Sequence, residues 1–380
     1  MAARTTKKRA PASRKTRGAA HSRVVVDLGE RSYPIEIGHG TLASAGDAIA
    51  AATGAERAAI ITVPEVGRRY APRLERSLRQ AGIKPVRITV PDGDKTKNLR
   101  QLGKLYDAFV EHQLDRSSVV VALGGGMVGD LSGFAAASYL RGIPFVQVPT
   151  TLLAMVDASV GGKVAINLPQ GKNLAGAFYQ PRLVWVDTET LASLPARDRA
   201  AGMTEIIKAG AIWDRALFES LEGNVERALA LDAAALHPVV ERACEIKAEV
   251  VSQDEREGGV RMLLNFGHTL GHAVEKIARY RGILHGEAVA IGMVYAAELS
   301  ESLGLARNCS VPIRELLGRT GVPLELPDHP RKAYLAALGV DKKKKGSRVH
   351  FVVLRRIGRA ETRPMTLAQI FPAKRARRRA

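Results

Sequence analysis

The sequence predicts an α/β domain built on a doubly wound sheet, followed by a mostly helical domain. The chain has 380 residues, which is more than a single hydrophobic core usually holds. Up to residue 190, Val- and Ile-rich runs alternate with helical stretches, and several of these runs are continuously apolar, as in parallel strands covered on both faces. From residue 191 onward helical periodicity dominates. We therefore place the α/β domain at 24–190 and the helical domain at 191–370.

The individual elements follow from these patterns. Strands are predicted at 23–29, 33–38, 58–63, 85–90, 118–126, 145–150 and 183–187. Helical spacing of apolar residues predicts helices at 65–81, 98–113, 198–212, 215–230, 234–253, 262–280, 286–304, 312–320 and 330–339. The run 348–358 alternates and is predicted to be a hairpin strand late in the chain.

The net charge of +19 is concentrated at the two ends of the chain. Residues 1–23 hold eight Lys or Arg and no acid, and residues 371–380 hold five more. Like-charge blocks with Ala, Ser and Pro are typical of disordered tails, so nucleic-acid binding is disfavoured, and aromatic residues make up only 5%. A weak polyanion contact by the tails and an N-terminal transit peptide remain open.

The composition indicates the cellular compartment in which the protein works. No apolar run approaches the roughly 18 residues that span a bilayer, and the basic N-terminus lacks the apolar segment of a signal peptide. The two cysteines, Cys244 and Cys309, form no disulfide framework and no CxxC motif. We expect a cytoplasmic protein without a membrane span.

The segment 122–136 joins an apolar strand to an apolar helix through three glycines, with Asp130 near the helix start. Glycine lets backbone N–H groups approach a pyrophosphate, and the helix dipole favours the negative charge. The spacing differs from GxGxxG, so a tight strand–helix turn and a phosphate site remain equally open.

The segment 149–181 is interrupted by Gly161, Gly162, Pro169 and Gly171, which argues against one long helix. It also carries a group of polar side chains that could converge on an anionic, hydroxyl-rich substrate: Asp157, Lys163, Lys172 and Asn173.

Three later segments carry possible metal ligands. Glu205 and Lys208 are three residues apart and share a helical face, His268 and His272 are four apart, and His285 precedes another helix. Two imidazoles and a carboxylate from different helices would form a divalent-metal site with an open position for substrate. The HxxxH spacing alone is weak, and Thr269 after His268 excludes the HExxH pattern. Lys247 and Arg261 nearby suggest a phosphorylated or carboxylated substrate.

Together these segments resemble the 3-dehydroquinate synthase family, a branch of the sugar phosphate cyclases. The resemblance covers nearly all of 24–360. It rests on "PDGDKTKN" (91–98), the whole of 124–181, "EIIKAG" (205–210), 246–275, "HGEAVAIGM" (285–293) and "DKK" (341–343).

The resemblance implies a Rossmann-like NAD-binding domain, a mostly α-helical metal-binding domain and an active site in the cleft between them. It implies that Zn or Co is held by Glu205, His268 and His285, so that His272 is no ligand. The implied NAD contacts are Asp92, Gly93, Asp94, Lys97, Gly125, Gly126, Asp130, Thr150, Thr151, Lys163, Lys172, Thr190 and Ser193. The implied catalytic and substrate-binding residues are Arg141, Asp157, Lys163, Lys172, Asn173, Lys208, Lys247, Arg261, Asn265, His272 and Lys343.

The implied reaction converts 3-deoxy-D-arabino-heptulosonate 7-phosphate into 3-dehydroquinate and phosphate, a step of the shikimate pathway to aromatic amino acids. The C5 alcohol is oxidised with NAD, phosphate leaves by β-elimination, the ketone is reduced again, and an intramolecular aldol closes the ring. The family also implies a homodimer. Asp94 departs from the Glu usual in the family, and Val63 replaces a polar residue near the adenosine ribose.

Two other enzyme classes remain open. A metal-dependent polyol or alcohol dehydrogenase would share the architecture but release NADH. A sister cyclase would act on an amino analogue, on glucose 6-phosphate or on sedoheptulose 7-phosphate. Asn265, His272, Lys247 and Arg261 favour a carboxylate-bearing substrate over the sister substrates.

Overall fold

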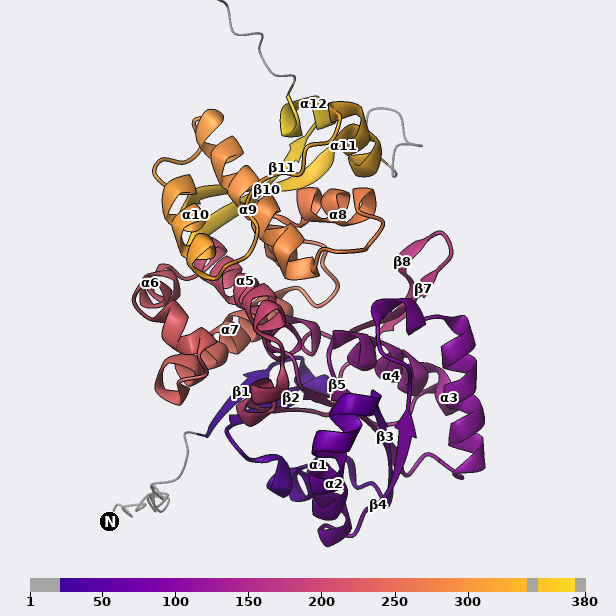
Figure 1. Ribbon diagram of the computed structural model, residues 1–380. Coiled ribbons are helices and arrows are strands. Elements are labelled where there is room, and N and C mark those ends of the chain that lie inside the picture. The colour runs from indigo at the N-terminus through magenta and orange to yellow at the C-terminus, as the bar shows by residue number, and fades with distance from the viewer. Residues whose placement is uncertain (1–20, 340–347, 373–380) are drawn as a thin grey trace, which may run out of the picture.

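A computed structural model describes residues 21–339 and 348–372, which form an α/β part and a helical part (Figure 1). The strands of the α/β part are β1 Ser22–Val26, β2 Tyr33–Gly38, β3 Arg57–Thr62, β4 Lys84–Thr89, β5 Ser118–Gly124, β6 Phe145–Pro149, β7 Lys163–Leu168, β8 Gly171–Phe178 and β9 Leu183–Asp187. Its helices are α1 Ala45–Thr53, α2 Pro64–Gln80, α3 Leu99–Glu111 and α4 Gly126–Ser138. The seven predicted strands are confirmed.

Seven strands form one sheet in the order β1-β2-β9-β6-β5-β3-β4, and all neighbours are parallel except the antiparallel pair β1–β2. The strand order reverses at β3, which has β4 on one side and β5 on the other. Ligands of open α/β sheets bind beyond the carboxyl ends of the strands at such a reversal. The glycine-rich turn after β5 lies at this point.

Both faces of the sheet are buried, which explains the continuously apolar strands. On β5, Val119, Val121 and Leu123 share one apolar cluster with residues of α1 and α2. Val120 and Ala122 of the same strand face the cluster that holds α3 and α4. Successive side chains of a strand point to opposite faces, so a strand between two helical layers is apolar throughout.

The helical part contains α5 Ala196–Ile212, α6 Arg215–Leu229, α7 Ala233–Gln253, α8 His268–Ile277, α9 His285–Ser302, α10 Ser310–Arg319, α11 Arg331–Leu338 and α12 Leu367–Ile370, with the hairpin β10 Val349–Arg356 and β11 Arg359–Met365. Its core is continuous with the β1–β2–β9 end of the sheet, where Val26, Ile35 and Val186 join the cluster that holds α5 and α7. This shared core places the helical part over one end of the sheet (Figure 1).

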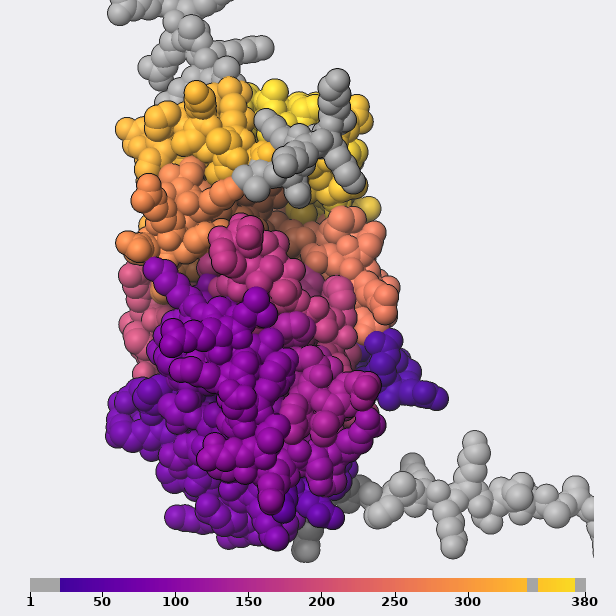
Figure 2. Space-filling model, turned by 90° about the vertical axis from the view of Figure 1, so that its right-hand side faces the viewer, coloured from indigo at the N-terminus to yellow at the C-terminus, as the bar shows by residue number. Residues whose placement is uncertain are grey.

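The structure differs from the predicted elements at three places. The glycine-interrupted segment folds as a π-helix at Ala154–Ala158 and the hairpin β7–β8, and the hairpin projects from the α/β part (Figure 1). Seen from that side, its magenta surface stands in front between the purple α/β part and the orange helices (Figure 2). The predicted helix 262–280 is divided, because Gly267 has φ +80° and lies tightly against Met293. The short Ala-rich helix α1 was not predicted.

The predicted tails are also shorter in the structure. Ser22 and Arg23 belong to β1, where Arg23 pairs with the buried Glu36. At the other end, the Phe371 ring stacks on Tyr295 and Tyr334, with centroids 5.7 and 5.2 Å apart. The fold therefore begins at Ser22, inside the predicted N-terminal tail of 1–23, and the described residues extend to 372, inside the predicted C-terminal tail of 371–380. The boundary at 190/191 remains a prediction; β9 ends at Asp187 and α5 begins at Ala196.

Within the described residues, no helix combines the length and apolar character needed to cross a bilayer.

Candidate active site

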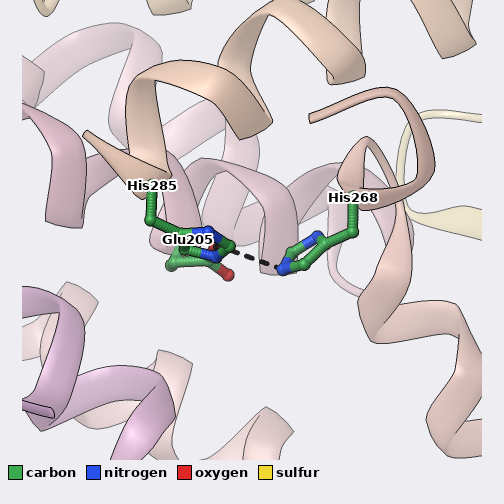
Figure 3. A group of neighbouring side chains, drawn as sticks. All are labelled: Glu205, His268 and His285. Carbon is green, nitrogen blue, oxygen red and sulfur yellow. Dashed lines mark ion pairs between the residues drawn. The ribbon is translucent and has the colours of Figure 1, made fainter. Parts of the chain in front are cut away.

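Glu205, His268 and His285 come from three different helices and meet at one point (Figure 3). Glu205 lies inside α5, whereas the two histidines are the first residues of α8 and α9. The Glu205 Oε1 atom is 3.8 Å from His268 Nε2 and 4.0 Å from His285 Nε2. One donor atom from each residue lies within 4.8 Å of the others, so the three side chains could hold one metal ion.

The local hydrogen bonds direct both Nε2 atoms toward Glu205. The Nδ1 atom of His268 is 3.2 Å from the Phe266 carbonyl oxygen, and that of His285 is 3.3 Å from Glu275 Oε2. Each ring can donate its Nδ1–H and keep the Nε2 lone pair free. Burial and the nearby Lys208 ammonium hold the pKa of His268 well below its usual range, which keeps this imidazole neutral.

The Glu205 carboxylate is the observation that most favours a cation here. Its side chain is 2% exposed, and neither oxygen has a hydrogen-bond partner among the described residues, although Lys208 forms an ion pair with Oε2. A buried charged oxygen without a partner is costly, and a metal ion would satisfy it. The donor set of two imidazoles and one carboxylate is typical of catalytic zinc sites, so these residues fit a divalent ion.

A cleft of about 540 Å³ is lined by two of these residues, His268 and His285. Both parts of the molecule contribute to its walls. The α/β part supplies Asp130, the π-helix around Asp157 and the hairpin β7–β8, and the helical part supplies residues of α5, α7, α8 and α9 and of the segment between α7 and α8. The predicted substrate residues that line it are Asp157, Lys163, Asn173, Lys208, Lys247, Arg261, Asn265 and His272.

Cations in this cleft are held by fixed partners. Lys247 donates to Asp157, Lys208 pairs with Glu205, and Lys163 pairs with Glu257. Burial lowers the pKa of Lys247. Burial would raise the pKa of Asp157, but Lys247 and Lys208 outweigh this effect and hold it well below its usual range. The Asp157 carboxylate therefore stays ionised and keeps the two ammonium groups in place.

Arg261 is 1% exposed, and its side chain lines the cleft. Its Nη1 donates to the Glu255 carbonyl oxygen and its Nη2 to that of Gly161 at 3.1 Å. Gly161 N–H in turn donates to the Tyr33 hydroxyl at 2.9 Å. The guanidinium is thus preorganised by backbone groups, with Nε unpartnered among the described residues.

His272 and Asn265 line the same cleft, as predicted from the sequence. The His272 ring lies next to those of His268 and His285, with centroids 5.5 and 5.9 Å away. Burial and His285 lower the pKa of His272. It is therefore a neutral imidazole at pH 7 that can accept a proton.

Most predicted NAD-binding residues lie beyond the carboxyl ends of the strands. Asp92, Gly93, Asp94 and Lys97 follow β4, Gly125 and Gly126 follow β5, Thr150 and Thr151 follow β6, and Thr190 and Ser193 follow β9. The N-cap of α4 is Gly125, which has no side-chain cap, so the first N–H groups of that helix have no capping side chain. A Cβ at Gly125 would lie 3.0 Å from Thr151 Cγ2. Glycine therefore fits this turn best.

A network of charged side chains continues from the carboxyl ends of the strands toward the candidate metal ligands. Lys97 Nζ donates to Asp130 Oδ2 at 2.6 Å and to Asn173 Oδ1 at 2.7 Å. Lys172 Nζ lies 3.1 Å from Asp94 Oδ2. Burial raises the pKa of Asp130 to about 6, against the opposing effect of Lys97. Predicted cofactor and substrate residues thus contact one another directly.

The described lining of the cleft does not include Arg141, Thr190, Ser193 or Lys343. Arg141 is exposed at the end of α4 and is not among the residues that line the cleft. The Ser193 hydroxyl and the Thr190 carbonyl accept from Tyr70, at 2.7 and 3.0 Å, so both are engaged within the fold. Lys343 lies outside the described residues.

Two acidic residues at the site were missed by the sequence reasoning. Glu257 binds both Lys163 and Asn265 Nδ2, from a loop position with φ +62° that no motif marks. Glu275 contacts His285. Its spacing of three residues after His272 and seven after His268 places it on the same helix face, so this spacing could have identified it.

Comparisons with known proteins agree over most of the chain. Residues 87–201 match the family model for the 3-dehydroquinate synthase N-terminal domain, and residues 202–344 match the model for the C-terminal domain. The 3-dehydroquinate synthase of Citrifermentans bemidjiense is 49% identical over 340 residues, covering 88% of this chain and 93% of the relative. That of Bordetella pertussis is 48% identical, covering 89% and 94%.

Solved structures give a similar result. The 2-epi-5-epi-valiolone synthase of Streptomyces hygroscopicus, with NAD+ and Zn2+ bound, has a TM-score of 0.82 and 29% identity, covering 90% of this chain and 96% of that one. A 2-deoxy-scyllo-inosose synthase complexed with carbaglucose-6-phosphate, NAD+ and Co2+ has a TM-score of 0.77 and 25% identity, covering 92% and 98%. A butanol dehydrogenase from Thermotoga maritima, at 14% identity and a TM-score of 0.63 with 88% and 94% covered, shares the fold.

Proposed function

This chain belongs to the 3-dehydroquinate synthase family, and from that premise we propose that its cleft converts 3-deoxy-D-arabino-heptulosonate 7-phosphate to 3-dehydroquinate and phosphate. The enzyme is a phosphate-eliminating lyase of the shikimate pathway that uses NAD and a divalent metal. The observation that carries the proposal is that a buried carboxylate, Glu205, and two imidazoles with free Nε2 atoms lie close enough to share one metal ion. The two imidazoles line a cleft that also holds several cationic side chains.

We assign the metal to Glu205, His268 and His285 and the cofactor to the carboxyl edge of the sheet. When bound, the metal acts as a Lewis acid at the substrate hydroxyl, and NAD takes up hydride and later returns it. Glu205 would supply one negative charge and the two imidazoles would bind through their Nε2 lone pairs, so these three residues would leave a divalent ion with a net positive charge. This charge favours an ionised substrate oxygen.

The cations of the cleft provide recognition of an anionic substrate. Arg261, Lys247 and Lys163 lie around the same space as His272, and each is held in place by a partner. Arg and Lys donors pair strongly with phosphate and carboxylate oxygens, most strongly where water is excluded. The substrate carries both groups, which accounts for more basic residues than a neutral polyol would need.

His272 is the candidate proton acceptor at the reacting hydroxyl. Its lowered pKa keeps the imidazole neutral at pH 7, and it faces the cleft beside the metal candidates. General base catalysis needs such a neutral group within reach of the proton that leaves. Elimination needs no further protein base, because the departing phosphate can take the neighbouring proton itself.

Release of phosphate from the heptulosonate phosphate with catalytic NAD and a divalent metal is the direct test. Many turnovers per NAD, without net absorbance at 340 nm, are expected. Steady NADH accumulation with simple polyols would instead identify a dehydrogenase. Faster turnover of glucose 6-phosphate or sedoheptulose 7-phosphate than of the acid would identify a sister cyclase.

We also propose that the enzyme is a cytoplasmic homodimer. The two cysteines are buried and unpaired, which suits a reducing compartment. Light scattering on the purified protein would give twice the chain mass of 40.8 kDa, and a monomer at micromolar concentration would contradict the proposal.

A further inference from the structure

Glu275 is a buried carboxylate on α8 that the proposed reaction does not use. The residue is 5% exposed, and glutamates are rarely buried this deeply unless they are paired. Its Oε2 atom lies 3.3 Å from His285 Nδ1, and its Oε1 atom lies 3.6 Å from Lys172 Nζ. Each oxygen thus faces a different nitrogen, and the carboxylate lies between a metal candidate and the hairpin β7–β8.

We propose that Glu275 is a positioning residue for the metal site, which fixes the ring of His285 through Nδ1 so that Nε2 faces Glu205. This role rests on the proposed function, because it requires His285 to be a metal ligand. Metal-binding histidines generally donate their other ring N–H to a carboxylate or a carbonyl, which sets the tautomer and the orientation of the ring.

A comparison of the two histidines supports this assignment. The ring of His268 is held by a backbone carbonyl, that of Phe266, which no substitution of a side chain removes. The ring of His285 depends on Glu275, and its side chain is 34% exposed compared with 12% for His268. The packing around His285 therefore constrains its ring less. A hydrogen bond from a side chain therefore has more influence on the orientation of the His285 ring than it would have on that of the His268 ring.

Lys172 explains why the Glu275 carboxylate keeps one orientation. The ammonium lies between Glu275 Oε1 and Asp94 Oδ2, and it also sits 4.3 Å from the centre of the Tyr280 ring. These contacts fix Oε1 toward the hairpin, so that Oε2 remains directed at His285. The orientation of a metal candidate in the helical part thereby depends on a lysine of the α/β part.

The same carboxylate could instead belong to a second ion. Donor atoms of His272, Glu275 and His285 also lie within 4.8 Å of one another. We favour positioning because both Glu275 oxygens already face nitrogen atoms, one of them in a hydrogen bond with His285 Nδ1. In Glu205, by contrast, Lys208 pairs with Oε2, whereas Oε1 has no partner closer than the two Nε2 atoms at 3.8 and 4.0 Å.

Titration of the metal-free protein with Co2+ tests the role without any turnover. The variants are Glu275→Ala, the isosteric Glu275→Gln, His285→Ala, and Glu287→Gln as control, because Glu287 is a buried glutamate of α9 that pairs with Arg197. We expect Glu275→Ala to weaken Co2+ binding by about 10- to 100-fold and to alter the visible Co2+ spectrum. Glu275→Gln, whose amide oxygen can still accept from Nδ1, should lose less, and Glu287→Gln should lose under threefold.

The outcomes separate this inference from the proposed function. If His285→Ala binds Co2+ as tightly as the wild type, the assignment of the metal site itself is wrong. If His285→Ala loses the ion while both Glu275 variants stay within twofold of wild type, the positioning role is wrong. Two Co2+ ions per wild-type chain and one in Glu275→Ala would also overturn it, in favour of a second site. Unchanged NAD affinity and thermal midpoint of the metal-free variants would exclude misfolding.

Discussion

At the scale of single residues, the clearest case of preorganisation is Arg261. Its guanidinium is buried, and Gly161 provides both a carbonyl that accepts from it and the space in which it lies. Gly161 has φ +96°, and a Cβ there would lie 2.4 Å from Arg261 Nη2. Glycine is therefore needed here both for the backbone conformation and for the closeness of the cation.

Gly161→Ala should lower kcat/KM by roughly 10- to 100-fold, because it displaces the guanidinium from its place in the cleft. Gly82→Ala is the matched control, since Gly82 has φ +81° and nothing lies within 4 Å of its added Cβ. Both variants should lose about 1–2 kcal/mol of unfolding free energy from backbone strain. Only Gly161→Ala should lose activity, and equal kinetics in the two would contradict a special role for Arg261.

His268 and His272 are four residues apart but should respond differently to substitution. His268→Ala removes a donor close to Glu205, so bound metal and turnover should both be lost. His272→Ala should keep the metal and slow turnover by about 10²–10⁴-fold, because a proton acceptor is missing. Metal analysis of the two purified variants decides between the roles, and loss of metal from both would show that the histidines act as one ligand pair.

Some residues of the site could be predicted from the sequence, and others could not. The histidines, Lys208 and Lys247 lie in helices with regular spacing, so their faces can be read from the periodicity. Glu257 sits in a loop at positive φ, and its contact with Asn265 depends on how that loop folds back. Arg141 carries a charge that the motif marks, yet the described chain leaves it outside the cleft. A motif identifies residue types, but only the folded chain determines which of them meet.

At the scale of elements, the site depends on how closely α5 and α9 cross. A Cβ at Gly286 would lie 1.9 Å from the Ala201 carbonyl oxygen, so α9 begins almost in contact with the α5 backbone. His285 directly precedes Gly286, and Glu205 lies one turn after Ala201. The helix crossing therefore sets the distance between His285 and Glu205, two of the three candidate metal ligands.

Gly286→Ala should force the two helices apart, costing about 1–3 kcal/mol of unfolding free energy and weakening Co2+ binding. Gly223→Ala in α6 has nothing within 4 Å of the added methyl group, and the better helix former should stabilise the protein by about 0.5–1 kcal/mol. Urea unfolding and Co2+ titration measure both effects. Unchanged Co2+ affinity in Gly286→Ala would mean that the crossing does not control the site.

The ion pair between Glu226 of α6 and Arg319 of α10 should make stability depend on pH. The bond to Arg319 lowers the pKa of Glu226 from 4.5 to about 2. A lowered folded-state pKa contributes stability that is present above the unfolded value of 4.5 and is lost as the pH falls toward 2.

The difference in thermal midpoint between wild type and Glu226→Gln should therefore shrink below pH 4.5. High salt should shrink it as well, since both groups are exposed. A difference that does not change with pH would exclude this ion pair as its source.

Elements were predicted where one face or both faces of the segment are regularly apolar. The strands of the large sheet are buried on both sides, so their apolar runs were unambiguous. The hairpin β7–β8 was missed because its strand β8 has no buried residue and carries Gly171, Gly176 and polar residues, and only Val164 and Ile166 of β7 are buried. The break at Gly267 follows from tight packing against Met293, which is a tertiary contact that no local pattern contains.

At the scale of the whole molecule, the two parts share a core on one side and are separated by a cleft on the other. The helical part and the β1–β2–β9 end of the sheet belong to one apolar cluster, which fixes their relative position. Among the described residues, the cations that line the cleft are Lys163, Lys208, Lys247 and Arg261, which belong to this folded body. Substrate recognition should therefore be independent of the basic ends of the chain, even though they contribute most of the net charge.

Removal of residues 1–20 and 373–380 should leave kcat/KM within about twofold and reduce only non-specific binding to polyanions, because the described lining of the cleft already supplies Lys163, Lys208, Lys247 and Arg261 as cations. Extending the N-terminal deletion through Arg23 should lower the thermal midpoint. It removes the pairing of Ser22 with Ile37 and of Arg23 with Glu36, and it leaves the buried Glu36 carboxylate without its guanidinium. Phosphate release and thermal unfolding of the two truncations distinguish these effects. Loss of turnover in the shorter deletion would mean that the basic ends take part in the reaction, which the position of the cleft argues against.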